Sequence, residues 1–148
     1  MNIIIGCDHG GFTLKGEIIA HLKAQGYELE DAGTFSEDSC DYPDFAHKVA
    51  SAVADGSFDR GILICGTGVG MSLAANKHKG IRAAAVSEHF SCKYTRLHND
   101  ANILCLGARV VGPGTACELC DLFLTTEFEG GRHARRIDKI EQSGKNEE

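Results

Sequence analysis

The sequence predicts an α/β fold: a single doubly wound, Rossmann-like parallel sheet of five strands with helices on both faces. Short apolar runs alternate along the chain with amphipathic stretches, a pattern typical of the β-α units that build parallel sheets. The runs are apolar or small at consecutive positions, as in Gly61–Ile64, which indicates strands covered on both faces. The chain has 148 residues, of which 43% are hydrophobic, and this size suits one core better than two domains.

Five strands and five helices are expected, in alternation. In the first helix Leu14, Ile18 and Leu22 recur at four-residue spacing, whereas Lys15 falls on another face. The predicted strands are Asn2–Cys7, Tyr27–Asp31, Arg60–Cys65, Ile81–Val86 and Asn102–Leu106. The predicted helices are Thr13–Ala24, Pro43–Ala54, Gly70–Lys77, Phe90–Leu97 and Thr115–Thr125.

Composition and charge argue against several classes of partner. The formal net charge is −6, from 15 basic and 21 acidic residues, which gives little electrostatic support for nucleic-acid binding. No apolar stretch approaches the roughly 20 residues of a membrane span, and the start lacks the basic segment of a secretion signal. We therefore expect a cytoplasmic protein with no membrane or nucleic-acid partner.

Residues 1–141 are expected to form the domain, and 142–148, which are polar and charged, a disordered tail. The seven cysteines are expected to be reduced, because their number is odd and no secretion signal precedes them. Cys117 and Cys120 are spaced like half of a zinc site, but no second pair is suitably spaced. We interpret them as helix residues and expect no metal.

The segment from Gly61 to Gly70 bears most directly on function. It sets a thiol, Cys65, at the end of a buried strand and directly before a glycine-rich loop. Glycines let backbone N–H groups approach a ligand closely, and a helix beginning near Val69 points its positive end to the same place. A thiol beside such an anion cradle predicts a catalytic base that faces an oxyanion.

Four familiar signatures are not met. A nucleotide triphosphatase loop needs Gly-Lys-Ser/Thr, but Met71 and Ser72 follow Gly70. The dinucleotide fingerprint places its third glycine one residue later than Gly70, which disfavours a nicotinamide cofactor. No Gly-x-Ser-x-Gly elbow supports a serine hydrolase. A thiol phosphatase loop, Cys-x5-Arg, would need arginine where this chain has Met71.

A second segment is expected to converge on the same place. In a doubly wound sheet of five units, the usual ligand crevice lies at the carboxyl ends of strands one and three. The loop after strand one carries Asp8 and His9, and the loop after strand three follows Cys65. A functional site at this crevice is therefore predicted. The simpler alternatives are that Asp8 caps the following helix and that the glycines only relieve crowding.

Beyond these features, seven segments resemble the type B ribose-5-phosphate isomerases. The similarity covers residues 1 to about 140, and the wider family includes galactose-6-phosphate and allose-6-phosphate isomerases. The segments are Gly6–Phe12, Asp41–Pro43, Ile64–Gly70, Ala75–Lys77, His98–Asp100, Gly107–Gly112 and Glu129–His133.

The resemblance implies interconversion of ribose 5-phosphate and ribulose 5-phosphate through a cis-enediolate, without a metal or an organic cofactor. It also implies a homodimer whose active site borrows residues from the neighbouring subunit, and pairing of dimers into tetramers is left open. Two alternatives stay open for the function. One is an isomerase of six-carbon sugar phosphates, and the other is a non-catalytic protein that binds a sugar phosphate in the same crevice.

By this resemblance, Cys65 is the base that removes a proton from one sugar carbon and returns it to the next. A free thiol has a pKa of about 8.5, so the N–H cradle and the helix end have to help form the thiolate. Thr67 matches a hydroxyl beside the developing charge, although a simple turn hydroxyl is the alternative. Backbone groups suited to bind the enediolate oxygen belong to Gly66, Gly68, Val69 and Gly70.

Ring opening and sugar binding are assigned by the same resemblance. His98 matches the ring-opening residue, which Asp8 is expected to assist, and a histidine can move protons near pH 7. Asp8 and Asn99 match positions that contact sugar hydroxyls, and Tyr42 matches one that lines the sugar site. Without the family, His98 would be interpreted as a surface or capping histidine.

Phosphate binding is assigned to Arg132, Arg136 and His9. The two arginines are four residues apart, so on a helix they share one face and suit a dianion, although a solvated basic patch is the alternative. Arg109 matches a residue contributed across the dimer interface. The resemblance assigns no role to Cys92, Cys105, Cys117 or Cys120.

Overall fold

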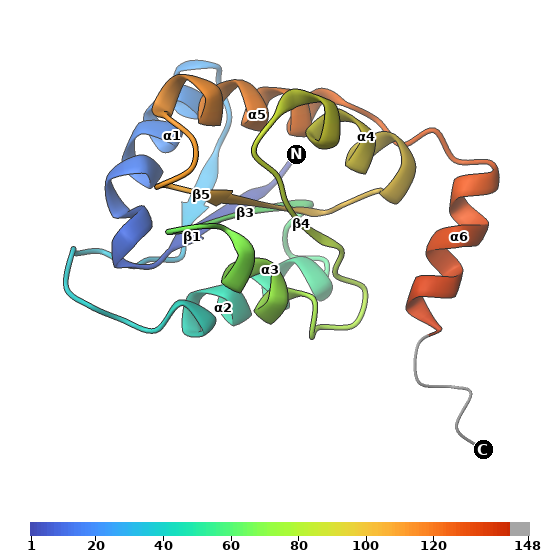
Figure 1. Ribbon diagram of the computed structural model, residues 1–148, viewed down its shortest axis with the longest axis horizontal. Coiled ribbons are helices and arrows are strands. Elements are labelled where there is room, and N and C mark those ends of the chain that lie inside the picture. Colours follow the sequence, from blue (N-terminus) through green and yellow to red (C-terminus); the bar gives the residue numbers. More distant parts are fainter. Residues whose placement is uncertain (143–148) are drawn as a thin grey trace.

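The five expected strands form one parallel sheet in the order β2-β1-β3-β5-β4. The computed structural model describes residues 1–142 (Figure 1). The strands are β1 (Ile3–Cys7), β2 (Leu29–Asp31), β3 (Arg60–Cys65), β4 (Ala83–Ala85) and β5 (Ile103–Gly107). The helices are the 3-10 helix η1 (His9–Gly11) and α1 (Phe12–Ala24), α2 (Tyr42–Ala54), α3 (Val69–Ala75), α4 (His89–Asn99), α5 (Pro113–Thr125) and α6 (Arg132–Glu141).

The predicted fold class is confirmed. The structure adds η1 and α6 to the five expected helices, and the other differences lie mainly at element ends. β2 and β4 are shorter than expected, with three residues each, because each lies at an edge of the sheet and pairs with one neighbour. The predicted tail begins at Gln142, which is the C-cap of α6. The rest of that tail, 143–148, lies outside the described residues. Within 1–142, no helix is long and apolar enough to span a bilayer.

Helices cover both faces of the sheet, as predicted. Figure 1 shows α1, α4 and α5 on one face and α2 and α3 on the other. Successive strand residues alternate between these layers. Ile3 and Ile5 pack with α1 and α5, whereas Ile4 packs with α2. Each side chain so buried contributes roughly 1.5–3 kcal/mol. Both faces of the central strands are therefore dry, which explains their continuous apolar sequence.

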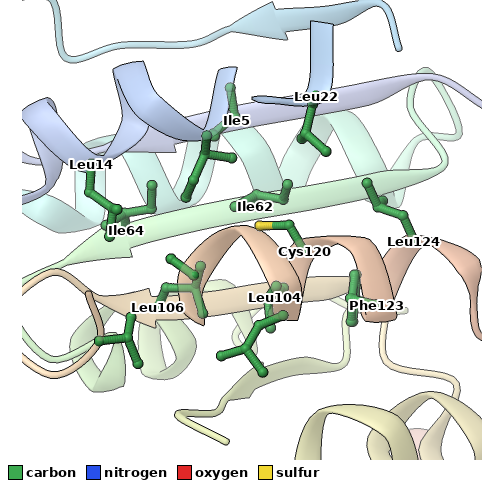
Figure 2. Close-up of a cluster of buried hydrophobic side chains, with 14 of the residues drawn as sticks. Ile5, Leu14, Leu22, Ile62, Ile64, Leu104, Leu106, Cys120, Phe123 and Leu124 are labelled. Carbon is green, nitrogen blue, oxygen red and sulfur yellow. The ribbon is translucent and has the colours of Figure 1, made fainter. Parts of the chain in front are cut away.

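The larger cluster of buried side chains shows how α1 is held (Figure 2). Leu14 and Leu22 of α1 point toward the sheet, where they approach Ile64 and Ile62 of β3 in the same cluster as Phe123 of α5. The four-residue spacing seen in the sequence therefore marks the face of α1 that packs on the sheet.

Lys15 also lies on α1, on another face as expected, but that face is not open to solvent. Its side chain is only 2% exposed, and its Nζ lies 2.6 Å from the Asp31 carboxylate at the end of β2. The same ammonium lies 5.0 Å from the centre of the Phe35 ring. A buried lysine requires such partners because an isolated charge is costly to desolvate. Lys15 thereby ties α1 to the loop that follows β2.

The pairing of β1 with β3 brings their two following loops together. Asp8, directly after β1, donates its backbone N–H to the Ile64 carbonyl at 3.1 Å. Gly11 then crosses so close to β3 that an added Cβ would lie 2.7 Å from the Ile64 carbonyl oxygen. Because that oxygen belongs to the sheet backbone, only glycine fits at this crossing.

This contact predicts opposite effects for the same substitution at two glycines. Gly11→Ala is expected to lower the free energy of unfolding by about 1–3 kcal/mol through overpacking against β3. Gly16→Ala is the matched control, because Gly16 lies within α1 with nothing within 4 Å of the added Cβ, and it should stabilise by about 0.5–1 kcal/mol. Urea unfolding at one protein concentration measures both, and equal effects would contradict the crossing geometry.

Candidate active site

Cys65 ends β3, and its side chain is 5% exposed. Gly68 donates its backbone N–H to the Cys65 Sγ, with the nitrogen and sulfur 3.1 Å apart. Gly68 has a φ of 79°, a left-handed conformation that turns the chain sharply after β3. α3, which begins at Val69 as predicted, directs its positive end to the same loop.

The loop after Cys65 presents its hydroxyl and its glycines to one side. The Thr67 side chain is exposed, and its Oγ1 accepts the Val69 N–H at 3.3 Å, which is the turn hydroxyl of the alternative interpretation. The hydroxyl proton is not used in that bond. Tyr42, the first residue of α2, lies against Gly70, where an added Cβ would be 2.8 Å from the ring. Tyr42 therefore lies beside the loop that follows Cys65.

Asp8 and His9 lie beside this loop. The Asp8 carboxylate is 7% exposed and accepts the Gly11 N–H at 3.2 Å, so Asp8 does cap η1, as the simpler alternative predicted. His9 is exposed, and its Nδ1 accepts the Cys40 N–H at 3.3 Å. A neutral ring that accepts at Nδ1 carries its proton on Nε2, and that N–H is the form suited to a phosphate oxygen.

Arg109 follows β5 and joins the same group. Its backbone N–H donates to the Gly66 carbonyl at 3.1 Å, and its Cδ would be 3.7 Å from a Cβ added at Gly66. The structure therefore places the base of this exposed side chain beside the Cys65 loop of its own chain. Ten of the predicted site residues therefore lie together at the carboxyl ends of β1, β3 and β5. They are Asp8, His9, Tyr42, Cys65, Gly66, Thr67, Gly68, Val69, Gly70 and Arg109.

A second group surrounds His98, in the last turn of α4. The His98 ring stacks on the His133 ring, with centroids 4.1 Å apart and an interplanar angle of 12°. Tyr94 contacts the other side of His98 edge-on at 4.9 Å. Glu129 places Oε2 3.4 Å from His133 Nε2 and 3.9 Å from His98 Nε2. Burial, followed by the nearby His98 and Arg132, lowers the pKa of His133 below its usual value.

Sequence reasoning missed Tyr94 and Glu129 as members of this group. The signal that could have found them is the four-residue spacing of Tyr94 to His98 and of Glu129 to His133, which places each pair on one side of a helix or helical turn. Nothing in the sequence alone indicated that the two pairs meet.

A buried network holds the end of α4, and with it His98 and Asn99. Arg96 is 2% exposed and donates to the Asp100 carboxylate and the Ala101 carbonyl, both at 2.7 Å. Asp100 has a φ of 45°, and its pairing with Arg96 stabilises the turn that ends the helix. Arg82 donates to the Asn99 carbonyl at 2.9 Å, so Asn99 is fixed from two directions.

α6 carries the two predicted phosphate ligands. Arg132 and Arg136 are exposed on one face of the helix, and neither forms an ion pair within residues 1–142. The far end of α6 is fastened by the Glu141 carboxylate, which lies 2.8 Å from the Arg82 guanidinium.

The residues around Cys65 and those on α4 and α6 lie at opposite ends of the molecule. Figure 1 shows α6 at one end of the long axis, whereas the loops that lead from β1 to α1 and from β3 to α3 lie toward the other. A cavity of about 680 Å³ between α6, β4 and α4 includes Asn99 but no residue of the Cys65 loop. The structure therefore does not bring His98, Asn99, Arg132 and Arg136 to the Cys65 of the same chain.

The other thiols differ from Cys65 in their surroundings. All seven cysteines are free. Burial raises the pKa of Cys7 and of Cys92 to about 11, and burial likewise raises the pKa of Cys105, Cys117 and Cys120. Such thiols stay protonated near neutral pH and serve as packing groups.

Taken together, a doubly wound sheet and a thiol held by backbone N–H at its switch point define an α/β enzyme that acts on a small anionic molecule. A family model described as Ribose/Galactose Isomerase matches residues 3–140. The chain therefore belongs to the ribose/galactose isomerase family, and it is an isomerase.

Individual relatives agree with this assignment. The chain is 54% identical over 138 residues, 93% of each chain, to ribose-5-phosphate isomerase B of Escherichia coli (strain K12). It is 52% identical, over 95% of each chain, to the putative sugar phosphate isomerase YwlF of Bacillus subtilis (strain 168).

Solved structures have the same fold. Ribose-5-phosphate isomerase B of Clostridium thermocellum matches over 100% of both chains, with a TM-score of 0.96 and 54% identity. The Mycoplasma genitalium ribose-5-phosphate isomerase B with bound ribulose 5-phosphate has a TM-score of 0.93 and 48% identity, and the match covers 98% of this chain and 97% of that one.

The raised pKa values predict a loss of stability in alkali. The folded protein holds the protons of Cys7 and Cys92 more tightly than the unfolded chain does. Below the ordinary thiol pKa, where both states keep these protons, the two thiols contribute their full stabilisation to the folded state. That stabilisation is lost as the pH rises from 9 to 11, by up to roughly 2–3 kcal/mol per thiol. Urea unfolding across this range should therefore show a shallower decline for Cys92→Ala than for the parent, and parallel declines would contradict the burial effect.

Proposed function

We propose that the protein interconverts ribose 5-phosphate and ribulose 5-phosphate through a cis-enediolate, with Cys65 as the base. The observation that carries this proposal is the Gly68 N–H directed at Cys65 Sγ, 3.1 Å away, at the carboxyl end of β3. Relatives named ribose-5-phosphate isomerase B, one of them solved with bound ribulose 5-phosphate, support the five-carbon substrate.

The reaction begins with ring opening, because a pentose phosphate with a closed ring has no free carbonyl. His98 is proposed to carry the proton between the hydroxyl on the anomeric carbon and the ring oxygen. Its half-buried ring contacts Tyr94 and His133, which orients its nitrogens, and an imidazole can both donate and accept a proton. Asp8 is proposed to assist, and Asp8 and Asn99 to hold sugar hydroxyls.

Proton transfer between carbons then needs one base. The Cys65 thiolate takes the proton from C2 of the open aldose, and the electron pair moves to the carbonyl oxygen on C1. N–H groups of the loop from Gly66 to Gly70 stabilise the resulting enediolate, and the exposed Thr67 hydroxyl relays a proton between its two oxygens. Cys65 then returns its proton to C1, so that the carbonyl stands at C2 and no proton is consumed. These steps use no metal or organic cofactor.

Phosphate binding and ring opening are proposed to depend on a second copy of the chain. α6, which carries Arg132 and Arg136, lies at the far end of the molecule from the loop that follows β3 (Figure 1). In a two-fold dimer, a partner would supply His98, Asn99 and both arginines to the Cys65 crevice, where His9 adds an N–H donor for phosphate. The proposed dimer then contains two identical composite sites, which means that each is built from residues of both subunits. An Arg109 lies near the subunit interface at each site.

Replacing the thiol tests the base directly. Cys65→Ala, assayed with ribose 5-phosphate in the presence of a chelator, is expected to lower kcat by about 100-fold to 10,000-fold, with the unfolding free energy largely retained. Cys105→Ala is the control, because Cys105 belongs to the same buried cluster on β5, and it should keep its turnover. An active Cys65→Ala variant would refute the assignment. An inactive parent would move the assay to allose and galactose 6-phosphates.

Mixing two inactive variants tests the composite site. Cys65→Ala and the double variant Arg132→Ala, Arg136→Ala are each expected to lose activity with limiting substrate. When their subunits are exchanged, half of the dimers are mixed and each mixed dimer has one intact site, so about a quarter of the parent activity should return. If all of these residues acted within one chain, no site would be intact and no activity would return.

A further inference from the structure

His133 has a buried nitrogen that no group in the described residues satisfies. The side chain is 4% exposed, and its Nε2 has no hydrogen-bond partner within 1–142. Two other ligand atoms face it, Oε2 of Glu129 and Nε2 of His98. All three atoms lie within 4.8 Å of one another. A buried polar atom without a partner is costly, so a group that fills this position gains free energy.

The backbone segment that carries Glu129 is fixed against α4. Glu129 donates its N–H to the Leu97 carbonyl at 3.1 Å, which fixes the loop before α6 against the last turn of α4. Arg96 donates to the Thr126 carbonyl in the same connection at 3.1 Å.

Two imidazoles and one carboxylate form a donor set that suits Zn²⁺. With bonds of about 2.1 Å, the ligand atoms of a tetrahedral zinc lie about 3.4 Å apart. The His133 and Glu129 atoms already lie 3.4 Å apart, and the His98 and Glu129 atoms lie 3.9 Å apart. His98 is half-buried, and its ring has to turn out of the stack with His133 for both Nε2 lone pairs to reach one ion.

We propose that His98, Glu129 and His133 bind one Zn²⁺, with the fourth position open to water, and that the ion inhibits the isomerase. The inhibition rests on the proposed function, because a zinc that occupies His98 Nε2 takes the nitrogen assigned to ring opening. Binding itself does not depend on that assignment. Zinc is then a reversible inhibitor of an enzyme whose proposed chemistry does not use a metal.

The local charge sets the strength expected of this site. Arg132 and Arg136 on the same helix oppose a dication, and Glu129 is the one carboxylate in the cluster. We therefore expect zinc affinity weaker than that of a closed structural site.

Glu129→Gln tests the proposal, with Glu127→Gln as the matched control. Glu127 is exposed two residues away and forms no ion pair among residues 1–142. Titration calorimetry with ZnCl₂ should show one bound ion for the parent and for Glu127→Gln, and at least about tenfold weaker binding for Glu129→Gln. Zinc should inhibit turnover of the parent and of Glu127→Gln at similar concentrations, and inhibition of Glu129→Gln should need a higher zinc concentration. Mg²⁺, which prefers oxygen ligands, should not inhibit.

Cobalt identifies the ligands independently of activity. Co²⁺ at this site is expected to show the visible d–d bands of a tetrahedral ion without a thiolate charge-transfer band in the near ultraviolet. A strong charge-transfer band, or equal zinc binding by Glu129→Gln and the parent, would overturn the proposal in favour of a thiol site such as Cys40 beside His9. Zinc binding without inhibition of an active parent would overturn the inhibitory role. A parent without turnover would refute the proposed isomerisation and leave the binding result intact.

Discussion

Adjacent pairing of β1 and β3 is the constraint on which the Cys65 site depends. Their register sets Cys7 opposite Ile64, so the two strands end at nearly the same level of the sheet. The Asp8 N–H then binds the Ile64 carbonyl, and Gly11 passes over the same residue. The position of Asp8 beside the Cys65 loop is therefore set by sheet backbone, which is stiffer than any side-chain contact.

Two buried cations, Lys15 and Arg96, fix loops that lie farther from the sheet. Lys15 holds the segment after β2 through Asp31, and Arg96 holds the turn after α4 through Asp100. Buried ion pairs contribute little net stability, because desolvation offsets most of the attraction. What they do supply is a defined geometry: removal of either partner would leave a charge without compensation. Arg96 thereby positions His98 and Asn99, although it contacts no part of the Cys65 crevice.

Local patterns predicted the fold and half of the candidate site. Strand runs and four-residue spacings depend on near neighbours in sequence, so the switch point beside Cys65 followed from them. The burial of Lys15 did not follow, because it depends on Asp31 in another element. The meeting of Glu129 with His98 depends on how the chain returns from α5 past the end of α4. The separation of α6 from Cys65 is a property of the whole topology, which periodicity does not encode.

The choice of partner for Cys65 also bears on how it can act as a base. A thiol beside a full positive charge loses its proton easily, but the resulting thiolate is a weaker proton acceptor. Here the bond to sulfur comes from the Gly68 N–H, a partial charge that the left-handed turn directs at 3.1 Å. The two arginines assigned to phosphate stand on α6, away from the Cys65 of their own chain, and would serve the neighbouring subunit of the proposed dimer. The fold thus separates the group that must accept and return a proton from the cations that hold the anion, and a composite dimer would reunite them only around the substrate.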